Sequence, residues 1–238
     1  MPLPNISAPE FKTILPSNKK EVFYRPFLVR EEKILLMALQ GGEEDEINNA
    51  VLQIIKNCVK LDEHEIINLP YYDIEYLFLQ LRSKSIENVI KLNLRHRSDV
   101  ECEHVTAYEL ILDDVNVEFS DKHTNKIMLT DSIGVVMKYP SISNTGDIAS
   151  KLNEDNVENI FEFIASSIET VYDNETIFED HTHEEMIEFI SNLNKEQFLK
   201  IINFYHTMPA LRHIVEYTCK QCGEAEKIEL RGLQSFFT

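Results

Sequence analysis

The segment Glu216-Tyr-Thr-Cys-Lys-Gln-Cys-Gly-Glu-Ala-Glu-Lys-Ile-Glu-Leu230 decides how we expect the C-terminal part of the chain to fold. Apolar residues alternate on both sides of the Cys-Lys-Gln-Cys-Gly turn, which predicts two strands joined by that turn. Two thiolates three residues apart, Cys219 and Cys222, can bind one cation, and Gly223 tolerates the positive φ that such a turn often needs. The segment is therefore half of a tetrahedral zinc site and requires two more ligands from elsewhere in the chain.

The chain has only two other cysteines. Cys58 lies in an apolar helical pattern and is interpreted as a small buried hydrophobic residue. Cys102 lies in a polar turn between two strand-like runs, and this turn also holds His96 and His104. Cys102 with either histidine completes a Cys3His set. We predict a closed structural zinc site formed by Cys102, His104, Cys219 and Cys222. The alternatives are an empty reduced hairpin and a weakened site that has lost a ligand.

A redox role for the C-x-x-C motif fits the sequence less well. Thioredoxin-like motifs place the reactive thiol at the N-terminus of a helix, where its pKa is lowered. Here the residues between the cysteines lie between two predicted strands, and no helix follows directly.

The composition narrows the classes of partner. The chain has 238 residues, with 41 acidic and 23 basic residues and a formal net charge of -18. Such a charge argues against nucleic acid and anionic membranes as partners. It fits either plain solubility or an acidic surface that docks onto a basic protein. We found no apolar run long enough for a transmembrane helix and no signal-like N-terminus, so we expect a protein of the reducing cytosol.

The hydrophobic period changes along the chain and predicts an α+β fold. Helical patterns precede residue 88, strand-like alternation follows to residue 139, helical patterns return, and strands resume near residue 213. We predict helical segments around a small discontinuous antiparallel β-module with a zinc-ribbon-like site. The predicted domains are a Pro-rich segment with helices (1–87), the β-module (88–139 plus 213–238) and a helical insertion (140–212). Residues 155–172 are predicted as one helix of that insertion.

No motif indicates catalysis. HExxH, GxSxG, GxxxxGK[ST] and GxGxxG are all absent from the sequence, and its six glycines make a phosphate-binding loop improbable. His181 and His183 lie among carboxylates, but they lack the i, i+4 spacing of two ligands on one helix face. We interpret that segment as an acidic helix start, with Thr182 and Glu185 forming a capping box. The sequence gives no positive evidence for an enzyme.

Four segments, taken in order, resemble baseplate hub proteins of T-even-type tailed phages. These segments are residues 73–87, the Cys102 turn, Val136-Met-Lys-Tyr-Pro-Ser141, and the end of the chain from Cys219 to Phe237. The resemblance extends from about Phe23 to Thr238.

This resemblance implies a non-enzymatic role, either as a structural hub subunit or as a hub assembly factor that leaves the finished particle. It implies other phage baseplate hub proteins as partners. The protein would lie in the host cytoplasm during assembly, and a hub subunit would also lie in the virion tail baseplate. Relatives often carry C-x-x-C in both turns, whereas the first turn here has only Cys102, so His104 would substitute for the missing cysteine. A metal-dependent enzyme of unknown substrate is the alternative function. The Pro-rich N-terminal segment and the apolar C-terminal end are candidate partner surfaces, unless they pack on the protein's own core.

Overall fold

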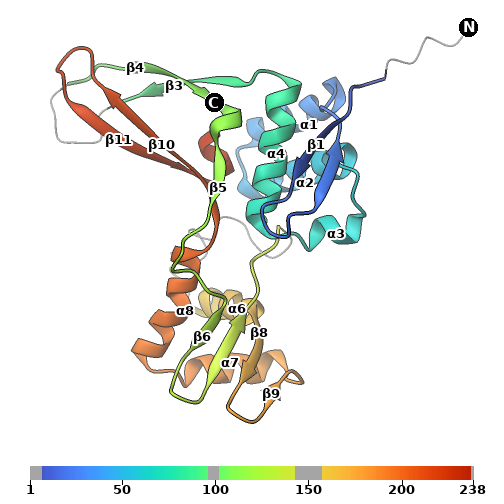
Figure 1. The fold of residues 1–238 in the computed structure, drawn as a ribbon, viewed down its shortest axis with the longest axis vertical. Coiled ribbons are helices and arrows are strands. Elements are labelled where there is room, and N and C mark those ends of the chain that lie inside the picture. The colour runs from blue at the N-terminus through green and yellow to red at the C-terminus, as the bar shows by residue number, and fades with distance from the viewer. Residues whose placement is uncertain (1–6, 96–101, 143–156, 237–238) are drawn as a thin grey trace, which may run out of the picture. The chain divides into compact units, whose positions relative to one another are not determined.

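The computed structural model describes residues 7–95, 102–142 and 157–236 (Figure 1). The chain divides into two compact units. Unit 1 consists of residues 1–66, 72–118 and 210–238, and unit 2 of residues 67–71 and 119–209. Both units combine helices with small antiparallel sheets, so the predicted α+β class is confirmed.

Unit 1 begins with a β-hairpin that packs on its own unit. Strands β1 (Phe11–Ile14) and β2 (Glu21–Tyr24) pair antiparallel. The side chains of Leu15, Val22 and Tyr24 are buried. The carboxylate of Asp73 accepts hydrogen bonds from the backbone N–H and the hydroxyl of Ser17 in the hairpin turn. The hairpin is thus fastened to helix α4, and these three apolar side chains complete the core.

Four helices follow the hairpin. They are α1 (Val29–Gly41), α2 (Glu44–Cys58), α3 (Glu63–Ile67) and α4 (Tyr71–Ser85). Helix α1 ends where Gly42 takes a φ of 76°, a conformation that glycine adopts at little cost. Helix α4 is the most buried of the four, and its Ile74, Leu77, Phe78 and Leu81 have at most 1% of their surface exposed.

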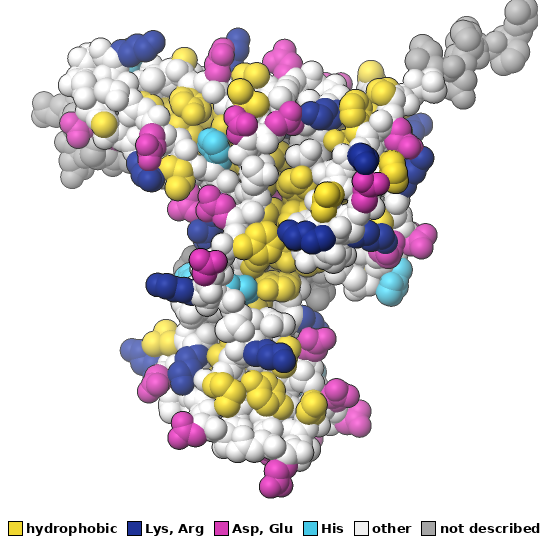
Figure 2. Space-filling view, in the orientation of Figure 1, with side chains coloured by type: hydrophobic (Ala, Val, Ile, Leu, Met, Phe, Trp, Pro, Cys, Tyr) yellow, Lys and Arg dark blue, Asp and Glu magenta, His cyan; other side chains and the backbone are white. Residues whose placement is uncertain are grey.

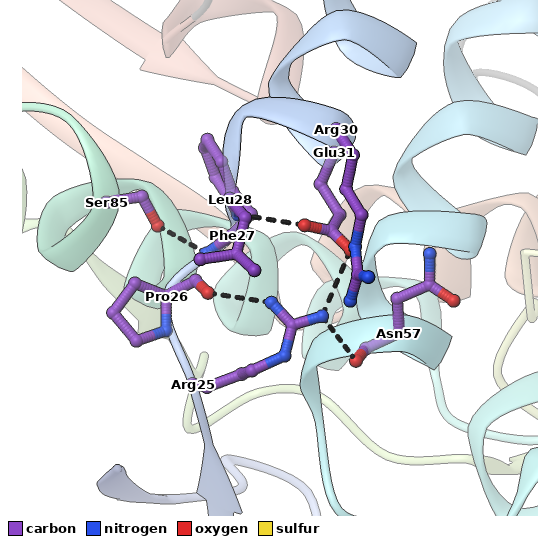
Figure 3. A network of polar contacts seen from close by, with 8 residues as sticks. All are labelled: Arg25, Pro26, Phe27, Leu28, Arg30, Glu31, Asn57 and Ser85. Atoms are coloured by element: carbon purple, nitrogen blue, oxygen red, sulfur yellow. Dashed lines mark hydrogen bonds and ion pairs between the residues drawn. The ribbon is translucent and has the colours of Figure 1, made fainter. Parts of the chain in front are cut away.

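A buried carboxylate fixes the start of α1 (Figure 3). Glu31 is fully buried and accepts hydrogen bonds from the backbone N–H of Leu28 and from the guanidinium groups of Arg25 and Arg30. The guanidinium of Arg25 also donates to the carbonyl of Asn57 at the end of α2. The network therefore ties the strand before α1 to α2, and it explains how a charged residue is tolerated inside the unit.

The sheets of unit 1 come from both halves of the chain. Strands β3 (Val89–Leu94) and β4 (Thr106–Ile111) form one hairpin. Strands β10 (Ala210–Thr218) and β11 (Ala225–Arg231) form a second, and β5 (Asn116–Glu118) pairs with the start of β10. Figure 1 shows the two hairpins side by side, and one apolar cluster contains residues of both, among them Ile90, Leu92, Val215 and Ile228.

The C-terminal end packs within unit 1. Leu233 and Phe236 are 5% and 1% exposed. The backbone N–H of Leu233 donates to the carboxylate of Glu75 at 2.9 Å, and Arg82 donates to the carbonyl of Phe236 at 2.7 Å. Leu233 and Phe236 therefore belong to the protein's own core, and Phe237 lies outside the described residues.

Unit 2 is a four-stranded antiparallel sheet with helices against it. The strands β6 (Lys126–Met128), β7 (Gly134–Met137), β8 (Ile168–Tyr172) and β9 (Ile177–Phe178) lie in that order. Helices α6 (Val157–Ser167), α7 (His183–Ser191) and α8 (Lys195–Thr207) share one apolar core with the sheet. Capping boxes start α7 and α8, with Thr182 and Asn194 as the N-caps, and the box at Thr182 confirms the prediction from the sequence.

Unit 2 differs from the predicted arrangement in two places. Residues 155–172 were expected to form one helix, but α6 ends at Ser167 and the run Ile-Glu-Thr-Val-Tyr continues as β8. This run is rich in β-branched residues, which favour strands. Strands β6 and β7 then pair with β8 instead of joining the sheets of unit 1, so residues 126–139 lie outside the β-module in which we placed them.

Candidate metal centre

The C-x-x-C turn joins β10 to β11, as the sequence predicts. The backbone N–H of Gly223 donates to the carbonyl of Cys219 at 2.9 Å, and the N–H of Cys219 donates to the carbonyl of Glu224 at 2.8 Å. Gly223 has a φ of 78°, which a residue with a side chain would adopt only at a cost. This tight turn places Cys219 inside the hairpin and leaves Cys222 exposed.

Cys102 reaches this turn from the segment between β3 and β4. Its sulfur lies 3.9 Å from the sulfur of Cys219. The three sulfurs of Cys102, Cys219 and Cys222 all lie within 4.8 Å of one another. In the described parts of the chain, no other group of three His, Cys, Asp or Glu ligand atoms comes this close together.

The spacing of the sulfurs fits a zinc ion. Zinc–thiolate bonds of about 2.3 Å in a tetrahedral site separate two sulfurs by about 3.8 Å. The distance between Cys102 and Cys219 has this value within about 0.1 Å, whereas a disulfide would require a separation of about 2.05 Å. All four cysteines are free thiols. The donor set also suits the metal, because thiolates favour zinc over the hard cations calcium and magnesium.

The pKa of the Cys222 thiol indicates what a cation would change. The backbone N–H of Glu224 lowers this pKa. Desolvation and the neighbouring thiols of Cys219 and Cys102 together raise it by more, so the pKa lies above its ordinary value. A second thiolate beside the first is unfavourable because like charges would lie in contact. A divalent cation between the sulfurs would reverse that preference.

The other predicted ligands are placed differently. His104 is partly buried in the described segment, but its ring nitrogens are not part of the group within 4.8 Å. His96 lies outside the described residues. Cys58 is buried in α2 and burial raises its pKa to about 11, in agreement with its interpretation as an inert core residue. Three sulfurs are therefore together, and no described His, Asp or Glu ligand atom joins them within 4.8 Å.

The acidic His181–His183 segment does not form a metal centre with three such ligand atoms. His183 begins α7 and contacts the carboxylate of Glu162. His181 and Glu185 instead line a groove in unit 2, which is otherwise mostly apolar. A second groove in unit 2 is lined in part by Lys122 and Lys126. No cysteine lines either groove, so neither groove is a substrate cleft that contains the thiols.

The family comparison covers nearly the whole chain. Residues 8–238 match the family described as T4 bacteriophage base plate protein. The chain belongs to this family. The baseplate protein matches no curated protein and no solved structure in the comparisons made. Among its described residues, no helix combines the length and the apolar character needed to cross a membrane.

Proposed function

We propose that this baseplate protein acts in the baseplate hub, as a structural subunit or as a hub assembly factor, and that it works by binding other hub proteins. The observation that carries the proposal is the family match over residues 8–238. The segments around Asp73, Cys102 and Cys219 resemble baseplate hub proteins, and this resemblance is why we propose the hub rather than another part of the baseplate. We further propose that the protein is not an enzyme, because none of the three clustered thiols lines either of the two grooves described above.

An exposed apolar stripe on α1 supports binding of another protein. Val29, Leu36 and Met37 are 80%, 52% and 61% exposed. Residues at positions i, i+7 and i+8 lie on the same face of a helix, so the three side chains share one face. The opposite face, with Leu35 and Ala38, packs into the unit. Exposed apolar side chains that share one helix face can form an interaction site.

We also propose that zinc binds Cys102, Cys219 and Cys222, with His104 as the fourth ligand. A zinc ion there would join the segment between β3 and β4 to the turn between β10 and β11. Its role would be structural, because it would replace weak contacts between two polar turns by metal bonds. The alternative function, a metal-dependent enzyme, would need the fourth position to remain open to substrate.

Complementation of a phage that lacks the gene tests the binding role. We would replace Leu36 and Met37 by Ser, and as a matched control replace the exposed Asn49 and Gln53 of α2 by Ser. Loss of assembled hubs with the L36S/M37S protein still soluble and folded supports the proposal. Normal phage yield from this variant removes the α1 stripe from the interface, and normal assembly without the gene contradicts the function itself.

Analysis of finished tails separates the two forms of the proposal. A structural subunit remains in purified tails in a fixed ratio to other baseplate proteins. An assembly factor is bound to hub intermediates in infected cells and absent from finished tails. Quantitative mass spectrometry of both fractions decides between them.

A further inference from the structure

Two rows of side chains cross the whole sheet of unit 2, one on each face. On the helix-covered face, paired residues form the row Ile127, Val135, Val171 and Phe178. Ile127 and Val135 are buried, but Phe178 at the end of the row is 46% exposed. The row ends at the edge of the sheet because β9 has no neighbour beyond it among the described strands.

The row on the opposite face is also apolar at both ends. It consists of Met128, Gly134, Tyr172 and Ile177. The ring of Tyr172 occupies the space that a Cβ on Gly134 would need, and its hydroxyl lies 3.3 Å from the sulfur of Met128. Met128 and Ile177 are 45% and 64% exposed, so each edge of the sheet presents an uncovered apolar side chain on this face.

The backbone hydrogen-bonding groups of the same two residues point away from the sheet. The N–H of Leu129 donates to the carbonyl of Ile133, and the N–H of Asp173 donates to the carbonyl of Thr176. Bonded and non-bonded pairs alternate along an antiparallel ladder. The N–H and C=O groups of Met128 therefore face outward from β6, and those of Ile177 face outward from β9.

The two edges carry opposite charge. The groove of about 450 Å³ along β6 is lined by Lys122, Lys126 and Lys200, with Glu196 as its one carboxylate. Around β9 the charge is negative, since residues 168–194 contain eight carboxylates and neither Lys nor Arg. The groove of about 310 Å³ at that edge is lined by apolar residues together with Asp173, His181 and Glu185. Figure 2 shows acidic side chains at the end of unit 2 that carries β9.

We propose that β9 of one copy of this chain pairs antiparallel with β6 of a second copy, which continues the sheet from one molecule into the next. The outward backbone groups of Ile177 meet those of Met128 in the second copy as one hydrogen-bonded pair. This register places Phe178 opposite Ile127, so both apolar rows continue across the contact. It also places Glu179 opposite Lys126, because an antiparallel pair changes by one residue in opposite directions.

Backbone direction allows Ile177 opposite Met128. The apolar rows and the pairing of Glu179 with Lys126 favour this register over one shifted by two residues. Because neighbouring strands in the order β6-β7-β8-β9 are antiparallel, β6 and β9 run in opposite directions. A second copy placed in the same orientation therefore presents its β6 antiparallel to β9 of the first. The contact is heterologous, since each copy uses two different edges, and it generates a ring or an open chain of molecules.

Proline substitutions block each edge separately. Met128→Pro and Ile177→Pro each remove one outward N–H that the isolated sheet does not use, and proline is tolerated on such edges. We expect each variant alone to be monomeric and an equimolar mixture to form dimers and nothing larger, because one open edge remains on each partner. Met128→Leu and Ile177→Val keep the N–H and serve as matched controls. Sedimentation velocity gives the masses, and circular dichroism checks the fold.

A charge exchange tests the register without disturbing the backbone. Lys126→Glu and Glu179→Lys should each weaken self-association by roughly two- to thirtyfold, because an opposite-charge cross-strand pair becomes a like-charge pair. Mixing the two variants, or combining them in one chain, should restore association. Lys33→Glu, on α1 of unit 1, makes the same charge change away from the sheet and should have no effect.

Three outcomes would overturn the proposal. The first is wild-type protein that stays monomeric at every soluble concentration in low salt. The second is association that persists in both proline variants separately. The third is a mixture of the two charge variants that associates no better than either one. A monomeric protein whose β9 edge binds a basic peptide would identify a different occupant and would equally contradict pairing between copies.

Discussion

The sulfur of Cys102 lies 3.9 Å from that of Cys219, although 117 residues separate them in the chain. Strands of unit 1 and residues 119–209 of unit 2 lie between the two cysteines in the sequence. The contact therefore closes a long loop. A bond that closes a long loop removes more freedom from the unfolded chain than one that closes a short loop.

Zinc binding should depend on this contact. We expect protein purified without chelators to contain one zinc per chain, and Cys219→Ser or Cys222→Ser to lose it. The loss should lower the free energy of unfolding by roughly 2–5 kcal/mol, similar to the loss of a native cross-link. Elemental analysis and thermal unfolding with and without a chelator measure both effects.

Two further variants act as controls for the zinc site. Cys58→Ala lies outside the sulfur group and should keep the metal. His104→Ala should weaken zinc binding if His104 is the fourth ligand, and unchanged affinity would assign that position to another group. Wild-type protein without zinc would contradict the metal proposal altogether.

Glu31 should make folding stability depend on pH at the acidic end. Burial raises its pKa, but the hydrogen bonds from Arg25, Arg30 and the backbone of Leu28 outweigh that effect, and the pKa falls from 4.5 to about 2. Because the folded pKa is the lower one, this stabilisation is present above about pH 4.5 and is lost as the pH falls toward 2. Its full size is about 3 kcal/mol.

Glu31→Gln should therefore destabilise the protein at neutral pH by an amount of this order. The difference between the variant and the wild type should shrink as the pH is lowered through the window from 4.5 to 2. Urea unfolding at a series of pH values measures it. Glu32→Gln, the neighbouring residue on α1, is the matched control, and an equal pH dependence in both variants would refute the assignment.

The carboxylate of Glu75 should hold the C-terminal end in place. Glu75→Leu leaves the buried N–H of Leu233 without its acceptor, which costs about 1–3 kcal/mol. Glu75→Gln retains an acceptor oxygen and should cost less. We expect limited proteolysis to cut the segment after Arg231 faster in the leucine variant, and equal cleavage of both variants would argue against this role.

Gly134 should be sensitive to substitution because Tyr172 lies over it. A Cβ at this position would approach the tyrosine hydroxyl to 2.4 Å, so Gly134→Ala must displace the ring. We expect a loss of roughly 1–3 kcal/mol in the free energy of unfolding. The double variant Gly134→Ala/Tyr172→Ala should lose less than the sum of the two single variants, since the clash is then gone. Chemical denaturation of the four proteins gives this coupling, and additive losses would contradict it.

Local patterns predicted the elements whose signals lie within a few residues. Helices α1 and α2 follow the apolar period of their sequences, and the capping box at Thr182 follows from short-range hydrogen bonds. The meeting of Cys102 with Cys219 was also predictable, because a half-complete ligand set requires a partner.

The pairing of distant strands was not predictable in the same way. The run Ile168–Tyr172 has apolar residues at positions that fit both a helix and a strand, and its β-branched residues were the only local sign of the strand. Whether β6 and β7 join one sheet or another depends on which edge is available after the helices have packed. The spacing of residues in the sequence does not show which sheet these strands join. Strand β9 has only two residues, too few to show an alternation of apolar and polar side chains.

The position of Leu233 and Phe236 in the core bears on how the protein is made. Their hydrogen bonds to Glu75 and Arg82 join the last described residues of unit 1 to helix α4. Residues 119–209 leave the ribosome before Leu233 and Phe236 do, so unit 1 completes its core only after all of these residues have been synthesised. Residues 119–209 can therefore fold first. A premature stop codon shortly before residue 233 would therefore spare unit 2 and leave unit 1 as a substrate for the host's proteases.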